Sequence, residues 1–92
     1  MLEIEFTSKM KRDVKRIQKR GKDMSKLDEA LRLLVSRQIL PLQFKDHKLK
    51  GEMREYRECH IEHDWLLVYQ IFEDRLILLA SGTGSHSDLF DQ

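Results

Sequence analysis

A β-hairpin is encoded by the segment Tyr56-Arg57-Glu58-Cys59-His60-Ile61-Glu62-His63-Asp64-Trp65-Leu66-Leu67-Val68-Tyr69. It reads as a strand, a tight turn and a second strand, with His60 and Asp64 on either side of the turn. Cys59, Ile61 and Leu67 are among the apolar residues that a buried hairpin requires. The same segment carries side chains that exchange protons near neutral pH, so structural and chemical roles overlap in it.

Further strands are expected around this hairpin. The residues from Trp65 to Phe72 are apolar on both faces, which predicts a strand in the middle of a sheet. Another apolar run, from Leu76 to Ala80, predicts the strand that follows. At the N-terminus, Leu2, Ile4 and Phe6 alternate with glutamates, which is the period of a half-buried strand.

Two helices are expected between the first strand and the hairpin. Thr7 or Ser8 can cap the first helix, and Gly21 can end it. The sequence 25–28 resembles a capping box that starts the second helix, and Pro41 prevents its continuation. The apolar stripe of the first helix is Met10, Val14 and Ile17, and that of the second is Leu27, Ala30, Leu31, Leu34 and Val35.

The order of these elements predicts an α+β fold. Ninety-two residues form one domain, residues 1–92, with an N-terminal strand, a helical hairpin and a three-stranded antiparallel meander. The helices are expected on one sheet face, which leaves the other face open. Residues 43–51 are expected to form a loop, and the tail from Gly82 is expected to start flexible and end in a short capped turn.

Composition and charge narrow the class of protein. No signal peptide or membrane-spanning run is visible, and the single cysteine, Cys59, fits a buried position in a cytoplasmic protein. Residues 9–26 hold nine basic residues and two aspartates, a charge of +7, while the whole chain carries +1. Such a helix indicates binding to a polyanion or to an acidic partner, with a merely solvated face as the alternative.

The histidines are the candidates for chemistry. His47, His60 and His86 come from a loop, a strand end and the tail. One imidazole can accept a proton while another, held charged by a carboxylate, donates one, and this pair suffices to cleave RNA beside its own 2′-hydroxyl. The alternatives are structural histidines, or a metal site at His60 and His63, whose side chains on a strand would point to opposite faces.

Three segments of the chain resemble the YafQ family of the RelE/ParE toxin superfamily: residues 45–51, 56–69 and 83–90. The resemblance implies the small RelE-like fold of microbial ribonucleases. It also implies the toxin of a type II toxin–antitoxin system, an endoribonuclease that cuts translated mRNA in the ribosomal A site without a metal or other cofactor. The implied partners are the ribosome, mRNA and a cognate DinJ-like antitoxin.

The resemblance also implies roles for single residues. His47 is expected to act as general base, His86 as general acid, and His60 to assist, while Asp64 holds an imidazolium and Phe90 stacks on the substrate base. Many relatives carry arginine where this chain has Gly82, so the cation that binds phosphate is either missing or supplied by Lys50, Arg54 or Arg57. Ribosomal RNA is expected to bind Lys11, Lys15, Arg16 and Lys19. The alternative is a ParE-like toxin that binds DNA gyrase and has no nuclease chemistry.

Overall fold

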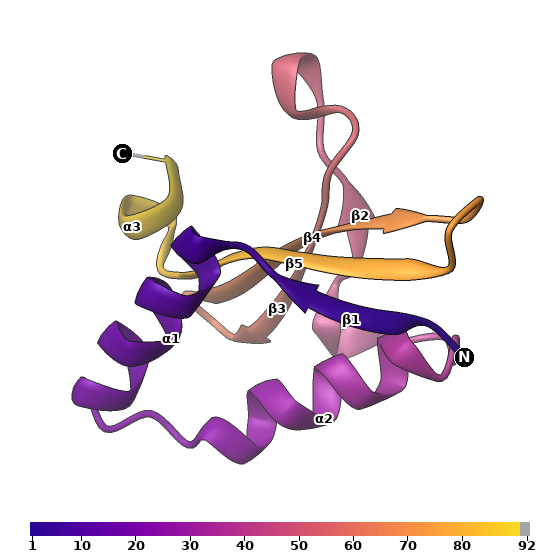
Figure 1. Ribbon diagram of the computed structural model, residues 1–92. Helices are drawn as coiled ribbons and strands as arrows, with labels where there is room; N and C mark the ends of the chain where they lie inside the picture. The colour runs from indigo at the N-terminus through magenta and orange to yellow at the C-terminus, as the bar shows by residue number, and fades with distance from the viewer. Residues whose placement is uncertain (91–92) are drawn as a thin grey trace.

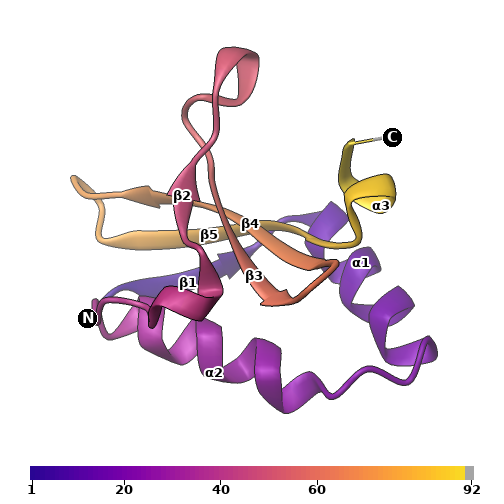
Figure 2. The same ribbon diagram turned by 180° about the vertical axis from the view of Figure 1, so that it is seen from behind.

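A five-stranded sheet in the strand order β1-β5-β4-β3-β2 forms one layer of the molecule (Figures 1 and 2). The computed structural model describes residues 1–90. The strands are β1 (Glu3–Phe6), β2 (His47–Lys48), β3 (Arg57–Glu62), β4 (Trp65–Phe72) and β5 (Ile77–Gly84). The helices are α1 (Ser8–Lys19), α2 (Met24–Val35) and α3 (His86–Phe90), with short 3₁₀ turns at Leu42–Phe44 and Gly51–Met53.

The predicted meander is confirmed as β3-β4-β5, in which each strand is antiparallel to the next. β4 is its middle strand, and Trp65 to Tyr69 are all buried, as the run of apolar residues predicted. β1 joins the sheet in parallel to β5 and lies at its edge. Edge placement leaves Ile4 and Phe6 more than a third exposed, so the alternation at the N-terminus marks a less buried strand than expected.

Helix α1 begins and ends where its sequence predicts. The hydroxyl of Thr7 accepts a hydrogen bond from the backbone N–H of Met10, and Gly21 follows the helix with a φ of 77°. Met10 and Ile17 are buried against the sheet. Among the described residues, no helix has both the length and the apolar character needed to cross a bilayer.

Helix α2 begins two residues earlier than the capping-box prediction. Its cap is Asp23, whose side chain accepts a hydrogen bond from the backbone N–H of Ser25, because a carboxylate at this position satisfies a free helix N–H group. The helices follow one another through residues 20–23, and each packs mainly on the sheet, α1 on β5 and α2 on β3. Both helices lie on the same sheet face, as expected. Their axes diverge from the turn that connects them (Figure 1).

Two segments expected to be irregular are strands. His47 and Lys48 form β2, which pairs with β3 through Glu58 and Arg57. Residues 82–84 are not a flexible start of the tail; they continue β5 and are buried. The two glycines suggested a flexible segment because glycine is unfavourable in strands. The segment is ordered because residues 82–84 pair with β4.

The C-terminal half of β5 extends beyond β1 and is closed by α1 instead. β1 pairs with residues 77–80 only, and beyond them the carboxylate of Asp13 accepts a hydrogen bond from the backbone N–H of Thr83 at 3.1 Å. Asp13 is 1% exposed and also accepts from Lys9 and Arg16, each at 2.7 Å. A side chain of α1 therefore takes the place of a partner strand at this edge.

Replacing Asp13 tests this closure. Asp13→Ala leaves the buried Thr83 N–H without its acceptor, and we expect the free energy of unfolding to fall by about 2–4 kcal/mol. Urea unfolding at pH 7 measures the change. Asp28→Ala, at an exposed position of α2, is the matched control and should change stability by less than about 0.5 kcal/mol. Equal effects of the two variants would contradict the role of Asp13.

Candidate active site

The alternation of β3 separates its side chains onto two faces. Cys59 belongs to the core beneath α1 and α2, together with Leu67 and Tyr69 of β4. Glu58 and His60 alternate with it and therefore project from the opposite face, which these helices leave open. His60 is paired with Leu66 in the sheet, and a bulge follows between His60 and Glu62.

Glycines form the adjoining part of this open face. Gly82 pairs with Val68 and Gly84 with Leu66, so β5 contributes no side chains there. Helix α3 packs over the surface that these two glycines leave without side chains. A methyl group added at Gly84 would come within 2.7 Å of the Asp88 carboxylate, and the φ of Gly84, 152°, is one that other residues rarely adopt.

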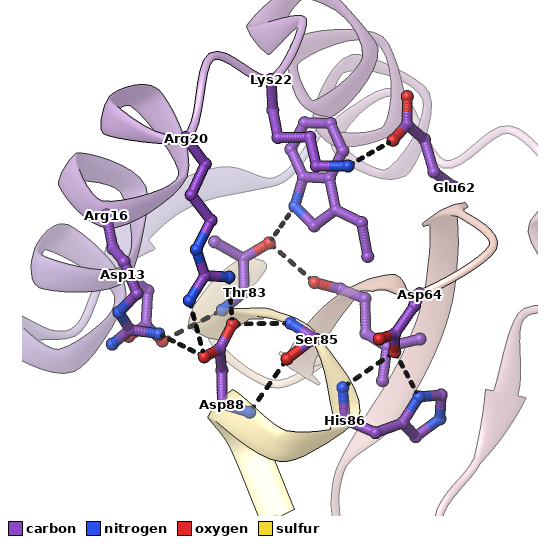
Figure 3. A network of polar contacts seen from close by, with 12 residues as sticks. Asp13, Arg16, Arg20, Lys22, Glu62, Asp64, Thr83, Ser85, His86 and Asp88 are labelled. Atoms are coloured by element: carbon purple, nitrogen blue, oxygen red, sulfur yellow. Dashed lines mark hydrogen bonds and ion pairs between the residues drawn. The ribbon is translucent and has the colours of Figure 1, made fainter.

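Helix α3 is fixed by a reciprocal cap and by an ion pair with α1 (Figure 3). The hydroxyl of Ser85 accepts from the backbone N–H of Asp88 at 3.1 Å, and the carboxylate of Asp88 accepts from the N–H of Ser85 at 2.9 Å. Arg20 donates two hydrogen bonds to the same carboxylate, at 2.5 and 2.9 Å. The Arg20 guanidinium holds the pKa of Asp88 well below its usual range.

Asp64, in the turn of the hairpin, binds the first residue of α3. Its Oδ1 accepts from the backbone N–H of His86 at 3.0 Å and lies 2.8 Å from Nδ1 of the same residue (Figure 3). The bond from the backbone N–H and then the one from the imidazole lower the pKa of Asp64. Because an ionised carboxylate can only accept, the proton of His86 is on Nδ1 and its Nε2 faces outward.

His60 and Phe90 flank His86. The ring centroids of His60 and His86 are 6.1 Å apart, and those of His86 and Phe90 are 6.4 Å apart. His60, Asp64 and His86 line one broad hollow of about 660 Å³. The structure therefore brings together four of the residues singled out in the sequence, although Asp64 and His86 are 22 positions apart.

His47 stands one strand farther across the sheet, beside a residue that the sequence reasoning missed. Glu58 is 5% exposed, and its Oε2 lies 3.7 Å from Nε2 of His47. Glu58, His86, Phe90 and Lys50 line a second hollow of about 280 Å³. Side chains alternate between the two faces of a strand, so residues two positions apart share a face. Glu58, two positions before His60, could therefore have been assigned to the same face from the sequence.

The other basic residues singled out in the sequence are not brought to the histidines. Arg57 projects toward the helix-covered face and binds Asp46 at 3.1 Å, whereas Arg54 donates to the carbonyl of Gly51 and lines a separate hollow. Arg16 is bound to Asp13 and Asp88. Three lysines of α1 are exposed and form no ion pair among residues 1–90: Lys11, Lys15 and Lys19.

The buried thiol does not belong to this site. Cys59 is fully buried in the core, and burial raises its pKa to about 12, so it remains a neutral thiol, as its place in an apolar strand predicted. Burial, and then the hydrogen bond to Asp46, raise the pKa of the Tyr69 phenol beside it. Within residues 1–90, no group of three or more histidine, cysteine or acidic side chains is arranged to hold a metal ion.

Comparison with known proteins agrees with this fold. Residues 2–91 match the family model of the bacterial toxin of type II toxin–antitoxin system, YafQ. The mRNA interferase toxin YafQ of Escherichia coli K12 is 40% identical over 89 residues, 96% of this chain and 95% of that protein. A metal-bound toxin from Helicobacter pylori superposes with a TM-score of 0.93 at 42% identity, over 98% of this chain and 100% of that one.

A fourth comparison includes a partner. The E. coli DinJ–YafQ complex contains a chain with a TM-score of 0.89 and 38% identity, over 98% of this chain and 99% of that one. Together, these likenesses confirm the α+β fold that the sequence predicted.

The contact between Asp64 and His86 predicts a single tautomer. In neutral wild-type protein we expect the His86 proton on Nδ1, because the carboxylate accepts it there. Asp64→Ala removes the acceptor, and the proton then distributes between both ring nitrogens. Long-range ¹⁵N–¹H NMR spectra distinguish the two tautomers directly. Asp74→Ala, an exposed aspartate in the β4–β5 turn, is the control, and a wild-type His86 protonated on Nε2 would contradict the assignment.

Proposed function

Because this chain belongs to the YafQ family of toxins of bacterial type II toxin–antitoxin systems, we propose that it cleaves translated mRNA in the ribosomal A site by histidine acid–base catalysis. It is an endoribonuclease of the mRNA interferase kind. In the proposed reaction the 2′-oxygen forms a bond to the adjacent phosphorus, and the bond from phosphorus to the 5′-oxygen breaks. The 2′-hydroxyl gives up one proton, and the leaving 5′-oxygen receives another.

The contact of Asp64 with His86 carries this proposal. A carboxylate 2.8 Å from Nδ1 stabilises the imidazolium and leaves the Nε2 proton free for the substrate. The second bond, from the backbone N–H of His86, fixes the residue at the start of α3. His86 is therefore suited to be the general acid that protonates the leaving 5′-oxygen.

His47 is suited to be the general base. Its Nδ1 lies 2.7 Å from the carbonyl oxygen of Lys45, which can only accept, so Nδ1 carries the proton and Nε2 has a free lone pair. The Glu58 carboxylate, 3.7 Å from Nε2, is placed to stabilise the imidazolium that forms when His47 takes the 2′-proton. Glu58 contacts His47 and also lines the hollow that contains His86, so one carboxylate lies next to both the proposed base and the proposed acid.

The remaining residues bind and orient the substrate. Lys50 lines the same hollow as His86 and supplies the cation for the phosphorane, whereas Arg54 and Arg57 do not reach it. Phe90 offers a ring 6.4 Å from that of His86 on which a base can stack. His60, 6.1 Å from His86 on the other side, adds charge and orientation.

The partners follow from the surface and from the family. The stripe formed by Lys11, Lys15 and Lys19, one helical turn apart on α1, is suited to phosphates of ribosomal RNA. A cognate antitoxin is the expected partner at rest, as the DinJ–YafQ complex of E. coli suggests. Because its proposed substrate is mRNA on ribosomes, the protein is expected to act in the cytoplasm.

Removing single histidines tests the chemistry. We expect His86→Ala to abolish mRNA cleavage, and His47→Ala and His60→Ala to lower its rate by about 10²–10⁴-fold, the scale of a general acid or base. His63→Ala, an exposed histidine outside the proposed set, is the matched control and should cut normally. Primer extension on mRNA in a translating extract measures cleavage.

Three parallel measurements separate the alternatives. Circular dichroism verifies that each variant is folded, and a fully active, folded His47→Ala protein would refute the assigned base. A gyrase supercoiling assay should show no inhibition; inhibition without mRNA cleavage would instead establish the ParE-like function. Cleavage should also withstand chelators, and its loss with recovery on adding zinc would indicate a metal enzyme.

Replacing the lysine stripe with glutamine at positions 11, 15 and 19 tests ribosome binding. With fewer counterions released, we expect weaker cosedimentation with ribosomes and a flatter dependence on salt. Arg16 is left in place because it holds Asp13. The control removes three charges at the other end of the molecule, Arg32, Arg37 and Arg75, and should bind as the wild type does. Unchanged binding of the stripe variant would exclude this surface.

A further inference from the structure

A further hollow, of about 140 Å³, lies where the beginning of α1 meets β5 and α3. Val68 and Gly82 belong to the open sheet face, and Phe90, Met53 and Tyr56 surround them. The segment that carries Met53 and Tyr56 is held in shape by a bond from the Tyr56 N–H to the Met53 carbonyl at 2.9 Å. An apolar cavity of roughly this size, about 150 Å³, accommodates a benzene-sized ring.

The ammonium group of Lys9 lies beside this hollow because Gly82 has no side chain. Nζ of Lys9 is 3.2 Å from the position that a Cβ at Gly82 would occupy. Its side chain is 48% exposed and is anchored to Asp13 at 2.7 Å, so it is both ordered and reachable from solvent. Cδ2 of Leu89 is also 3.2 Å from that position and the Asp13 carboxylate is 3.3 Å from it, so a side chain at position 82 would press on all three groups.

The charges around Lys9 leave an excess of positive charge. Lys9, Arg16 and Arg20 are the cations of the cluster, and Asp13 and Asp88 are its carboxylates, which gives a net charge of +1. Lys9 is the only one of these cations that lines the hollow. The ligand favoured here therefore has a flat apolar part for the rings and a negative charge for the ammonium.

The hollow adjoins the proposed cleavage site. Phe90 and Met53 line it and also line the hollow that contains Lys50, Glu58 and His86. A single strand of RNA that crosses the open face passes Phe90 from one hollow into the other. Aromatic walls beside a cation match the way in which proteins bind successive nucleotides of single strands.

We propose that the hollow between Lys9, Tyr56, Gly82 and Phe90 binds the nucleotide next to the cleaved phosphate. Its base lies against the Tyr56 and Phe90 rings, and its phosphate meets the Lys9 ammonium. The assignment rests on the proposed ribonuclease function and adds a second position of substrate contact. Lys9 binds and positions substrate there and moves no proton.

Oligonucleotides of increasing length test the assignment. The probes are 2′-O-methyl RNAs of two, three and four residues, in each of the four homopolymeric sequences, which cannot undergo 2′-attack. Affinities come from NMR titrations that follow the amides of Gly82 and Phe90. For the wild type we expect about tenfold tighter binding on the extension that fills this hollow, the scale of one stacked base.

The variants separate charge from stacking. Lys9→Met should lose the gain in affinity and lower the salt slope by about 0.7, the contribution of one phosphate contact on a single strand. Lys9→Arg should restore the gain in affinity with length, and Tyr56→Leu should reduce that gain. Arg12→Met, an exposed position of α1, is the control for lost charge and should behave as wild type. Urea unfolding verifies that Lys9→Met is folded.

The outcomes distinguish this assignment from the function on which it rests. If the wild type cleaves mRNA but Lys9→Met keeps the full gain with length, the nucleotide site is wrong and the ribonuclease stands. If the wild type neither cleaves mRNA nor binds any of the oligonucleotides, both fail. If Arg12→Met also loses the gain in affinity with length, the oligonucleotides are attracted to the charge of α1 in general, and the assignment of the nucleotide site is wrong.

Discussion

Strand β5 extends past its parallel partner β1, and the carboxylate of Asp13 closes the edge that is left. A buried carboxylate is unfavourable unless it is fully hydrogen-bonded, and this one receives the Thr83 N–H, Lys9 and Arg16. Its removal would leave the Thr83 N–H at this strand edge without an acceptor and take away one of the contacts that hold α1 on β5. The path of the chain after Thr83, and with it the position of His86, depends on this contact.

Two further carboxylates then fix α3 from opposite sides. Asp88 binds Arg20, the residue that follows α1, and Asp64 of the hairpin binds His86. Both carboxyl groups have a pKa below their ordinary value of 3.8, so each contact contributes its full stabilisation above that pH. The contribution is lost only as the pH falls toward the lowered pKa values. Both carboxylates that contact the five-residue helix α3 are therefore ionised throughout the range in which imidazoles titrate.

Periodicity predicted the parts of the fold that depend on neighbours in the sequence. The apolar run of β4 and the apolar stripes of α1 and α2 correctly indicated which residues are buried. It did not predict that Gly82 and Gly84 continue β5, because their order comes from pairing with β4 and from the helix packed over them. The pairing of Asp64 with His86 joins distant positions, so the sequence indicated only that Asp64 holds an imidazolium and did not identify which histidine it contacts. Arg57, by contrast, could have been excluded from the phosphate-binding candidates. It is three positions from His60 on β3, so its side chain projects from the opposite sheet face.

The basic segment serves two purposes because a helix distributes its charges around its axis. Five of its nine cations bind carboxylates: Lys9, Arg16, Arg20, Lys22 and Lys26 meet Asp13, Asp88 and Glu62. Those pairs hold α1 and the start of α2 against the sheet and α3. Four cations remain unpaired within residues 1–90, and three of them form the outward lysine stripe. Under the proposed function, long-range attraction to a polyanion is assigned to that stripe, while Lys9, which is paired yet half exposed, brings positive charge to the edge of the open face.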